Sequence, residues 1–242
     1  MSEPEGDIAP GQLPHEIDHS HPDVTGGWLR AATFGAMDGL VSNSALIAGV
    51  AAGAGAHTVV LSGVAGLLAG AFSMALGEYT SVTTANEQID SQVRIERRSF
   101  ERHPHAERDE LVSMLMDMGM SENTARQATE EIHRDEDQAV HFHLAQELGV
   151  DPREKPSPVT AAISSFVMFA VGAIVPLFPY LLGAEKLWLG LLCSAVGLLM
   201  AGAVAARFTK GSMWFGAGRQ LVFGAIAIAA TYAVGNLVEA AL

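Results

Sequence analysis

The sequence predicts an all-α membrane protein, with five transmembrane helices and a cytosolic helical insert between the second and the third. Although the chain of 242 residues contains 27 acidic residues, 49% of its residues are hydrophobic, so the charges must be segregated from long apolar segments. A helix needs about 20 apolar residues to cross the ~30 Å hydrocarbon core of a bilayer. The sequence shows no two-residue alternation typical of strands. Five runs have the required length: 29–54, 58–82, 159–182, 187–206 and 220–238.

Residues 1–27 form a polar tail before the first of these runs. The tail contains six acidic residues and no apolar run, so it lacks the basic start and apolar centre of a secretory signal. We therefore expect it to be retained, disordered and cytoplasmic. The alternative to a solvated tail is a loose transition-metal site formed by His15, Glu16, Asp18, His19 and His21. The remaining domains are helices one and two (28–83), the insert (84–157) and helices three to five (158–242).

The first apolar run contains one acid, Asp38. A charged side chain inside a bilayer is costly, so it normally faces a protein interior or a wet pathway. Ser42 lies one turn after Asp38 on the same helix face, with Asn43 beside it. We interpret these residues as part of an ion path; the alternative is a structural acid that is hydrogen-bonded to a neighbouring helix. Small residues at intervals of four also allow close packing against a second copy: Gly35, Gly39, Ala45, Gly49 and Gly53.

The second apolar run ends in a methionine and an acid. Met74 and Glu78 are four residues apart, so their side chains share one face of a helix. A thioether is a soft ligand and a carboxylate a hard one. Together with Asp38 they suit a borderline ion such as Fe²⁺ better than Mg²⁺ or Ca²⁺. Packing is the ordinary role of a methionine in an apolar helix, and it is the alternative for Met74.

The insert is predicted to be helical throughout. Because neither Gly nor Pro interrupts residues 79–103, the second helix should continue out of the membrane as far as Pro104. Three shorter helices should follow, at about 106–118, 121–133 and 135–148. Their predicted buried residues are Leu111, Val112, Leu115 and Met118 in the first and Val140, Leu144 and Leu148 in the last.

The insert is also acidic, which argues against a nucleic-acid surface. Residues 86–155 contain 17 acidic and nine basic residues. Glu107 and Glu110 are three residues apart and point the same way on a helix. Glu96 and Glu147 could join them if the short helices fold back on the long one. Taken singly, each glutamate is most simply interpreted as a solvated side chain. Together, the four carboxylates could bind a divalent metal.

The basic residues predict the topology. Nine of the 14 Lys and Arg residues lie within 94–155 and three more lie at the fourth connection, whereas the C-terminal end after Asn236 has none. By the positive-inside rule, the N-terminus and the insert are cytoplasmic and the C-terminus lies across the membrane. The absence of targeting features suits a bacterial cell membrane. The single cysteine, Cys193, excludes a disulfide framework and a cysteine metal cluster.

Several motifs resemble those of the vacuolar iron transporter family. They are MDGLVSNSALIAGVAAG in the first helix, GAFSMALGEYTSV in the second and GAIVPLFPY in the third. The resemblance runs from about Trp28 to the end of the chain. It implies a homodimer that exports Fe²⁺, and often Mn²⁺, from the cytosol in exchange for protons. It also implies a metal path between the first and second helices of both subunits, and Asp38 and Met74 match its residues.

The path departs from the family pattern at three positions. Ala31 and Gly66 stand where plant members have acids, and Glu78 stands where such members have glycine. Glu78 could therefore supply a missing acid one turn closer to the cytosol.

The resemblance further implies a metal site in the insert. The residues that match family metal-binding positions there are Glu96, Glu107, Glu110 and Glu147. Another family glutamate corresponds to Ser99, and a methionine pair corresponds to His143 and Leu144. An imidazole from His103 or His143 could substitute for these ligands.

These observations favour a transporter that moves divalent iron, manganese or both out of the cytosol, with the metal as cargo, no tightly bound cofactor and no enzymatic activity. Two alternatives stay open. The first is a membrane-anchored metal store or sensor without transport. The second is a carboxylate ferroxidase, although a di-iron helix bundle needs two Glu-x-x-His motifs and the insert has one, Glu130 to His133.

Overall fold

The computed structural model describes residues 27–149 and 151–241, and the predicted tail lies outside these residues apart from Gly27. The fold is all-α, as predicted, and the described residues contain no strand. The helices are α1 (Trp28–Ala51), α2 (Ala56–Arg102), α3 (Pro104–Asp117), α4 (Glu122–Ile132), α5 (Glu136–Leu148), α6 (Pro158–Leu181), α7 (Leu187–Phe208) and α8 (Met213–Ala241).

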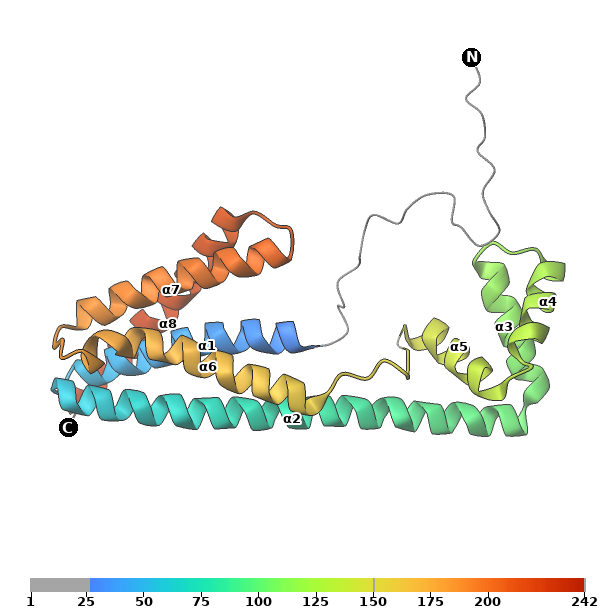
Figure 1. The fold of residues 1–242 in the computed structure, drawn as a ribbon, viewed down its shortest axis with the longest axis horizontal. Coiled ribbons are helices and arrows are strands. Elements are labelled where there is room, and N and C mark those ends of the chain that lie inside the picture. Colours follow the sequence, from blue (N-terminus) through green and yellow to red (C-terminus); the bar gives the residue numbers. More distant parts are fainter. Residues whose placement is uncertain (1–26, 150, 242) are drawn as a thin grey trace, which may run out of the picture.

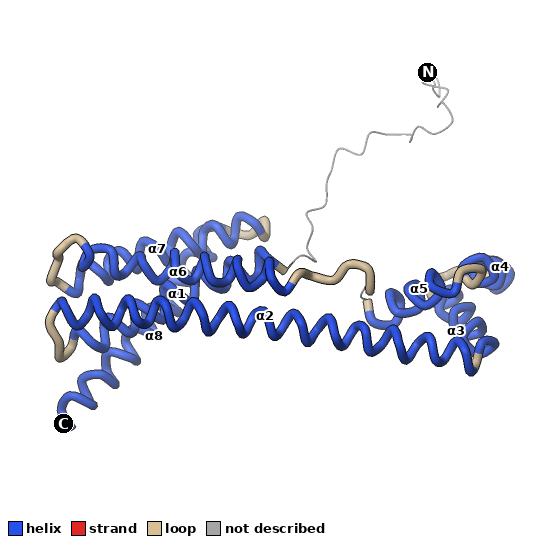
Figure 2. The backbone as a smooth tube through the Cα atoms, turned by 60° about the horizontal axis from the view of Figure 1, so that its bottom comes forward, coloured by secondary structure: helices blue, strands red, loops and turns tan. Residues whose placement is uncertain are grey.

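Helix α2 spans the whole length of an elongated molecule (Figure 1). Its first half packs against α6 and α1. Helices α7 and α8 complete the bundle by packing on α1 and on each other. The second half of α2 carries a lobe made of α3, α4 and α5 (Figures 1 and 2). Five of the helices, α1, α2, α6, α7 and α8, are long and apolar enough to cross a membrane. The five predicted spans and the unbroken second helix, 47 residues long, are therefore confirmed.

The last span begins earlier than the sequence indicated. We expected a start near residue 220, but α8 begins at Met213. The hydroxyl of Ser212 accepts a hydrogen bond from the Phe215 amide at 3.4 Å, which satisfies one of the free N–H groups of the first turn. A window that seeks only apolar residues misses this turn, because Arg219 lies within the helix.

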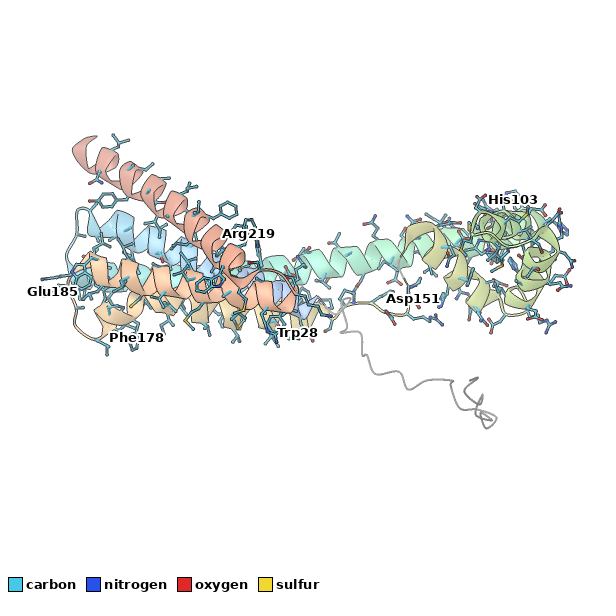
Figure 3. The ribbon with its side chains drawn as sticks, turned by 90° about the horizontal axis from the view of Figure 1, so that it is seen from above. Trp28, His103, Asp151, Phe178, Glu185 and Arg219 are labelled. Carbon is cyan, nitrogen blue, oxygen red and sulfur yellow. The ribbon has the colours of Figure 1, made fainter. Side chains whose placement is uncertain are left out.

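Trp28 and Arg219 lie toward the lobe end of the bundle, whereas Phe178 and Glu185 lie at the opposite end (Figure 3). Asp151 lies between the bundle and the lobe, and His103 lies at the far end of the lobe. The basic α7–α8 connection and the lobe are therefore on one side of the bundle. This arrangement is the one that the charge distribution predicts for a cytoplasmic lobe.

Glycines of α1 pack against α6. A methyl group added at Gly39 would approach the backbone nitrogen of Ala173 to 2.9 Å, and one at Gly35 would approach the carbonyl oxygen of Ser165 to 2.7 Å. These glycines therefore let the two helix backbones touch. The sequence argument assigned the small-residue face of α1 to a second copy of the chain, but in this structure α6 covers its first half.

Gly39→Ala should destabilise the bundle, because the added methyl meets α6 backbone rather than a flexible side chain. Overpacking of this kind costs about 1–3 kcal/mol. A lower temperature of aggregation in detergent would report the loss. Gly218→Ala in α8 is the matched control, since its methyl would meet nothing within 4 Å. A Gly39→Ala protein as stable as this control would contradict the packing argument.

The lobe has two apolar clusters. Leu111, Val112 and Leu115 of α3 pack against Ala125 of α4, and Phe100 of α2 packs against a second group formed by Ala139, Val140 and Leu144 of α5. The predicted burial of Met118 is wrong, because its side chain is 55% exposed. Met118 is the residue that caps α3, and Gly119 with φ 98° then turns the chain away from the cluster. The side chain of Leu148 is outside the described residues.

Candidate functional site

A cavity of about 320 Å³ lies between α1, α2 and α6 within the apolar bundle. The side chains that give it chemical character are Asp38, Ser42, Asn43, Ser73, Met74 and Phe169. The sequence-predicted residues Asp38, Ser42, Asn43 and Met74 thus line the same cavity. The side chain of Asp38 is exposed where it lines the cavity. It is therefore not a structural acid that is buried in a contact between helices.

Asn43 lines the cavity with an amide whose orientation is fixed by α6. Its Nδ2 donates a hydrogen bond to the carbonyl oxygen of Ala173 at 2.6 Å. Since a carbonyl can only accept, this contact fixes the orientation of the amide. The remaining atom, Oδ1, is buried and without a hydrogen-bond partner among the described residues. A buried carbonyl oxygen of this kind is costly unless a donor or a cation reaches it.

Glycines of α2 make room for the cavity. Gly66 lies opposite Asn43, where an added methyl would stand 3.3 Å from Oδ1, and Gly70 faces the ring of Phe169. Met74 follows one turn later and packs against the cluster that contains Phe169. Its thioether therefore has both the packing contact expected of a methionine and access to the cavity.

The fifth residue predicted for the ion path, Glu78, lies outside the cavity. It is four residues beyond Met74 on α2, but it is not among the residues that line the cavity. Its carboxylate forms an ion pair with Arg30 of α1, and its side chain is 12% exposed. Arg30 precedes Asp38 by eight residues, or about 12 Å of helix rise. The pair thus closes α1 onto α2 between the cavity and the lobe.

A second group of polar residues, called the lobe group below, converges in the lobe and consists of Glu96, Glu107, His143 and Glu147. Glu96 of α2, Glu107 of α3 and Glu147 of α5 surround His143, also of α5. Nδ1 of His143 lies 3.4 Å from Glu96 Oε1, 3.7 Å from Glu107 Oε2 and 3.9 Å from Glu147 Oε1. Ligand atoms of Glu96, His143 and Glu147 lie within 4.8 Å of one another. The predicted folding of the short helices back onto the long one does bring these acids together.

The other predicted residues of this group lie at its edge or beyond it. Glu110 is exposed on α3, yet its charge still acts on Glu96 and Glu147. His103 is exposed at the junction of α2 and α3. Ser99 donates a hydrogen bond to Glu107 Oε1. The serine thus holds one of the carboxylates in place.

The electrostatics of this group favour a bound cation. Burial, together with the charges of Glu147, Glu107 and Glu110, raises the pKa of Glu96 to about 7. Burial, followed by the same neighbours Glu110 and Glu107, also raises the pKa of Glu147. Burial lowers the pKa of His143 to about 4, so its imidazole is neutral at pH 7 and has a free lone pair. A divalent cation would relieve the repulsion among the acids.

Buried polar atoms without partners point to the same place. They include Glu96 Oε1 and both ring nitrogens of His143, whose side chain is fully buried. Such atoms are rare in folded proteins, because each loses its hydrogen bonds to water. A metal ion bound by one imidazole and several carboxylates would satisfy Glu96 Oε1 and the ring nitrogen of His143 that faces the acids.

Comparison with known proteins places the chain in a family. A family model described as the VIT family matches residues 29–236. The chain belongs to the VIT family. It is 34% identical to a vacuolar iron transporter of Acanthamoeba castellanii, over 89% of this chain and 80% of that protein. It is 36% identical to vacuolar iron transporter homolog 1 of Oryza sativa subsp. japonica, over 87% of this chain and 73% of that protein.

Family membership and the five apolar helices together show a multi-pass membrane protein. In this VIT family member, two positions that the sequence analysis singled out have small residues, and the structure shows what surrounds each of them. Ala31 is buried against Val82 and Ala161, where an acid would lack space and water. Gly66 forms part of the cavity wall.

Sequence reasoning missed two polar residues of this VIT family member. Ser73 lines the cavity, and it could have been found by extending the face of Gly66 and Gly70 by one turn. His133 at the end of α4 lies beside the lobe group, with ring centres 5.5 Å from His143 and 5.3 Å from Phe100. The sequence drew attention to it only as half of a Glu-x-x-His motif, and its partner Glu130 is exposed.

Proposed function

We propose that this VIT family member moves divalent iron, manganese or both out of the cytosol through the cavity of Asp38 and Met74. One observation carries the proposal. Within largely apolar spans, a carboxylate, an amide with an unpartnered oxygen and a thioether line one cavity. The names of the relatives agree with this proposal, since they are vacuolar iron transporters.

The cavity has the ligand types that a borderline divalent ion prefers. Asp38 supplies the negative charge, Asn43 Oδ1 a neutral oxygen and Met74 a sulfur. Mg²⁺ and Ca²⁺ prefer all-oxygen sites, whereas a sulfur favours later transition metals. A carboxylate binds either a metal ion or a proton, so alternate occupation of Asp38 would couple metal export to proton return.

The lobe acts as the capture site of this mechanism. Its acids gather metal from the cytosol, and the metal then passes along α2 to the bundle. Glu78 lies on this route, next to Arg30 and between the lobe and the cavity. A metal ion that reaches Glu78 would compete with the guanidinium for the same carboxylate.

We also propose a homodimer that pairs the first two helices of each copy. The support is the outer face of α2, which exposes apolar side chains at helical spacing beside the cavity: Leu61, Val64, Leu68, Phe72 and Leu76. Residues from a second copy would then complete the wall opposite Asp38. The lobe and the N-terminus would be cytoplasmic in both copies.

Two alternatives predict different results. A metal store or sensor would bind metal in the lobe but would give no flux in sealed vesicles. A ferroxidase would consume Fe²⁺ in detergent in the presence of oxygen. The exposed position of Glu130 disfavours the second alternative, because its carboxylate does not reach the lobe group. Iron uptake by proteoliposomes, combined with a ferroxidase assay of the same sample, separates all three.

Replacing Glu96, Glu107, Glu110 and Glu147 together by glutamine should slow transport without stopping it. The change removes the capture site but leaves the cavity intact. Metal affinity of the lobe should fall by more than about 100-fold, since loss of an outer-shell partner alone costs 10–100-fold. Calorimetric titration of the detergent-solubilised chain and initial uptake rates in proteoliposomes measure the two effects.

The control for charge replaces four exposed glutamates of the insert, Glu101, Glu130, Glu131 and Glu136, by glutamine. It removes the same number of negative charges outside the group. Equal losses in both quadruple variants would show that general attraction of cations, rather than this site, explains the effect.

A further inference from the structure

The histidine at the centre of the lobe group has one nitrogen toward the acids and one away from them. Nδ1 of His143 faces the three carboxylates at 3.4–3.9 Å. Nε2, on the other edge of the ring, is buried without a hydrogen-bond partner among the described residues. When a neutral imidazole binds metal through one nitrogen, the other carries the proton and needs an acceptor.

The neighbouring His133 offers an acceptor nitrogen, because a hydrogen bond fixes its tautomer. Its Nδ1 lies 2.9 Å from the carbonyl oxygen of Thr129. Because a carbonyl can only accept, Nδ1 must carry the proton, and in the neutral ring the lone pair is then on Nε2. That nitrogen is also buried and without a partner. Beside the lobe group, the described residues therefore leave two nitrogens unpaired: Nε2 of His143, which needs an acceptor, and Nε2 of His133, which can accept.

The two rings have the separation that a hydrogen bond between them requires. Their centres are 5.5 Å apart, and their planes are nearly perpendicular at 81°. An N–H···N bond with about 3 Å between the nitrogens would place the ring centres roughly 5.3 Å apart. Phe100 stacks on His133 at 5.3 Å and meets the edge of His143 at 5.0 Å, so it holds both rings in place.

We propose that His133 is a positioning residue of the lobe metal site: its Nε2 accepts a hydrogen bond from Nε2–H of metal-bound His143. The chain of contacts runs from the metal ion through His143 and His133 to the carbonyl of Thr129. It selects the tautomer in which Nδ1 of His143 is the ligand. The inference rests on the proposed capture of metal by the lobe. It gives His133 a role different from the di-iron ligand that the Glu-x-x-His motif suggested.

Two substitutions separate this role from packing. His133→Phe keeps an aromatic ring that can stack on Phe100 but removes the acceptor. His133→Gln loses the ring but places an amide oxygen near the position of Nε2. Binding of Co²⁺ to the full chain in detergent, followed by visible absorption, gives the affinity, and the signal that disappears in His143→Ala identifies the lobe site.

His133→Phe should weaken Co²⁺ binding by about 10–100-fold, the range typical of lost outer-shell partners, and His133→Gln should stay within about threefold of the unaltered chain. Unchanged affinity in His133→Phe would overturn the inference. So would a loss in His133→Gln as large as in His133→Phe, because the ring and not the acceptor would then matter.

Pulsed electron paramagnetic resonance of bound Cu²⁺ gives a second readout that packing alone would not alter. The quadrupole coupling of the remote imidazole nitrogen reports its hydrogen bond. The measurement uses a chain with His15, His19 and His21 replaced by alanine, so that the tail does not compete. His133→Phe should shift this coupling toward that of a free N–H, and an unshifted coupling would contradict the proposal.

The same samples show which proposal has failed. If the unaltered chain takes up iron in proteoliposomes while His133→Phe binds Co²⁺ normally, the transport proposal stands and the inference about His133 falls. If Co²⁺ binding does not depend on His143 at all, the capture step is wrong and the inference falls with it. Iron uptake would still decide the transport proposal.

Discussion

Asp38→Asn is expected to abolish metal uptake by proteoliposomes while the protein still inserts and folds. Asparagine has nearly the same shape as aspartate, but it removes the one negative charge among the residues that line the cavity. Asn43, Ser42 and Ser73 are neutral. Removing the partner of a charge in a low-dielectric site costs about 3–5 kcal/mol, or roughly 10²–10⁴-fold in occupancy.

The control for Asp38→Asn is Glu185→Gln. Glu185 is exposed at the end of the bundle away from the lobe, so it tests the loss of an acid outside the cavity (Figure 3). Uptake should be unchanged in this variant. Unchanged uptake in Asp38→Asn itself would identify Asp38 as a structural acid, and the cavity would lose its assigned role.

Met74→Ala is expected to have the second-largest effect on uptake. It removes the sulfur ligand and also a side chain that packs against the cluster of Phe169. Met74→Leu separates these causes, since a swap of methionine for leucine conserves volume and usually costs less than about 1.5 kcal/mol of stability. We expect uptake of Fe²⁺ to be lost in the alanine variant and to fall more than about tenfold in the leucine variant.

The choice of metal sharpens this test. Mn²⁺ prefers oxygen ligands more strongly than Fe²⁺ does, so loss of the thioether should reduce uptake of Fe²⁺ more than uptake of Mn²⁺. Competition between the two ions in the same vesicles measures the change. If Met74→Leu transports both ions as the unaltered protein does, Met74 is a packing residue and the sulfur has no part in the path.

Much of the fold could be predicted because its signals are local. Apolar length gave the spans, and the absence of Gly and Pro over 79–103 gave the long extension of α2. The lobe helices could be predicted from the residues that cap them. The hydroxyl of Ser121 accepts a hydrogen bond from the Thr124 amide at the start of α4, and Gly149 ends α5 in the left-handed conformation. The predicted start of the last span was wrong, because the hydroxyl of Ser212 caps α8 and Arg219 lies within the helix, so apolarity alone does not reveal its first turn.

The sites could be predicted only where helical spacing determined them. Asp38, Ser42 and Met74 follow from their positions on two helix faces. The pairing of Glu78 with Arg30 does not, because it joins residues 48 positions apart and depends on how α1 and α2 are aligned. The role of Asn43 likewise depends on a carbonyl of α6, and the position of His133 depends on how α4 returns to α5.

The most direct test of the account is iron flux through the protein alone. Purified protein in sealed liposomes with an acidic lumen should accumulate Fe²⁺ from the outside, and the lumen should become more alkaline as metal enters. Liposomes without protein should show neither change. Iron binding by the lobe without any accumulation inside the liposomes would contradict the transport proposal and would identify the protein as a membrane-anchored metal store or sensor.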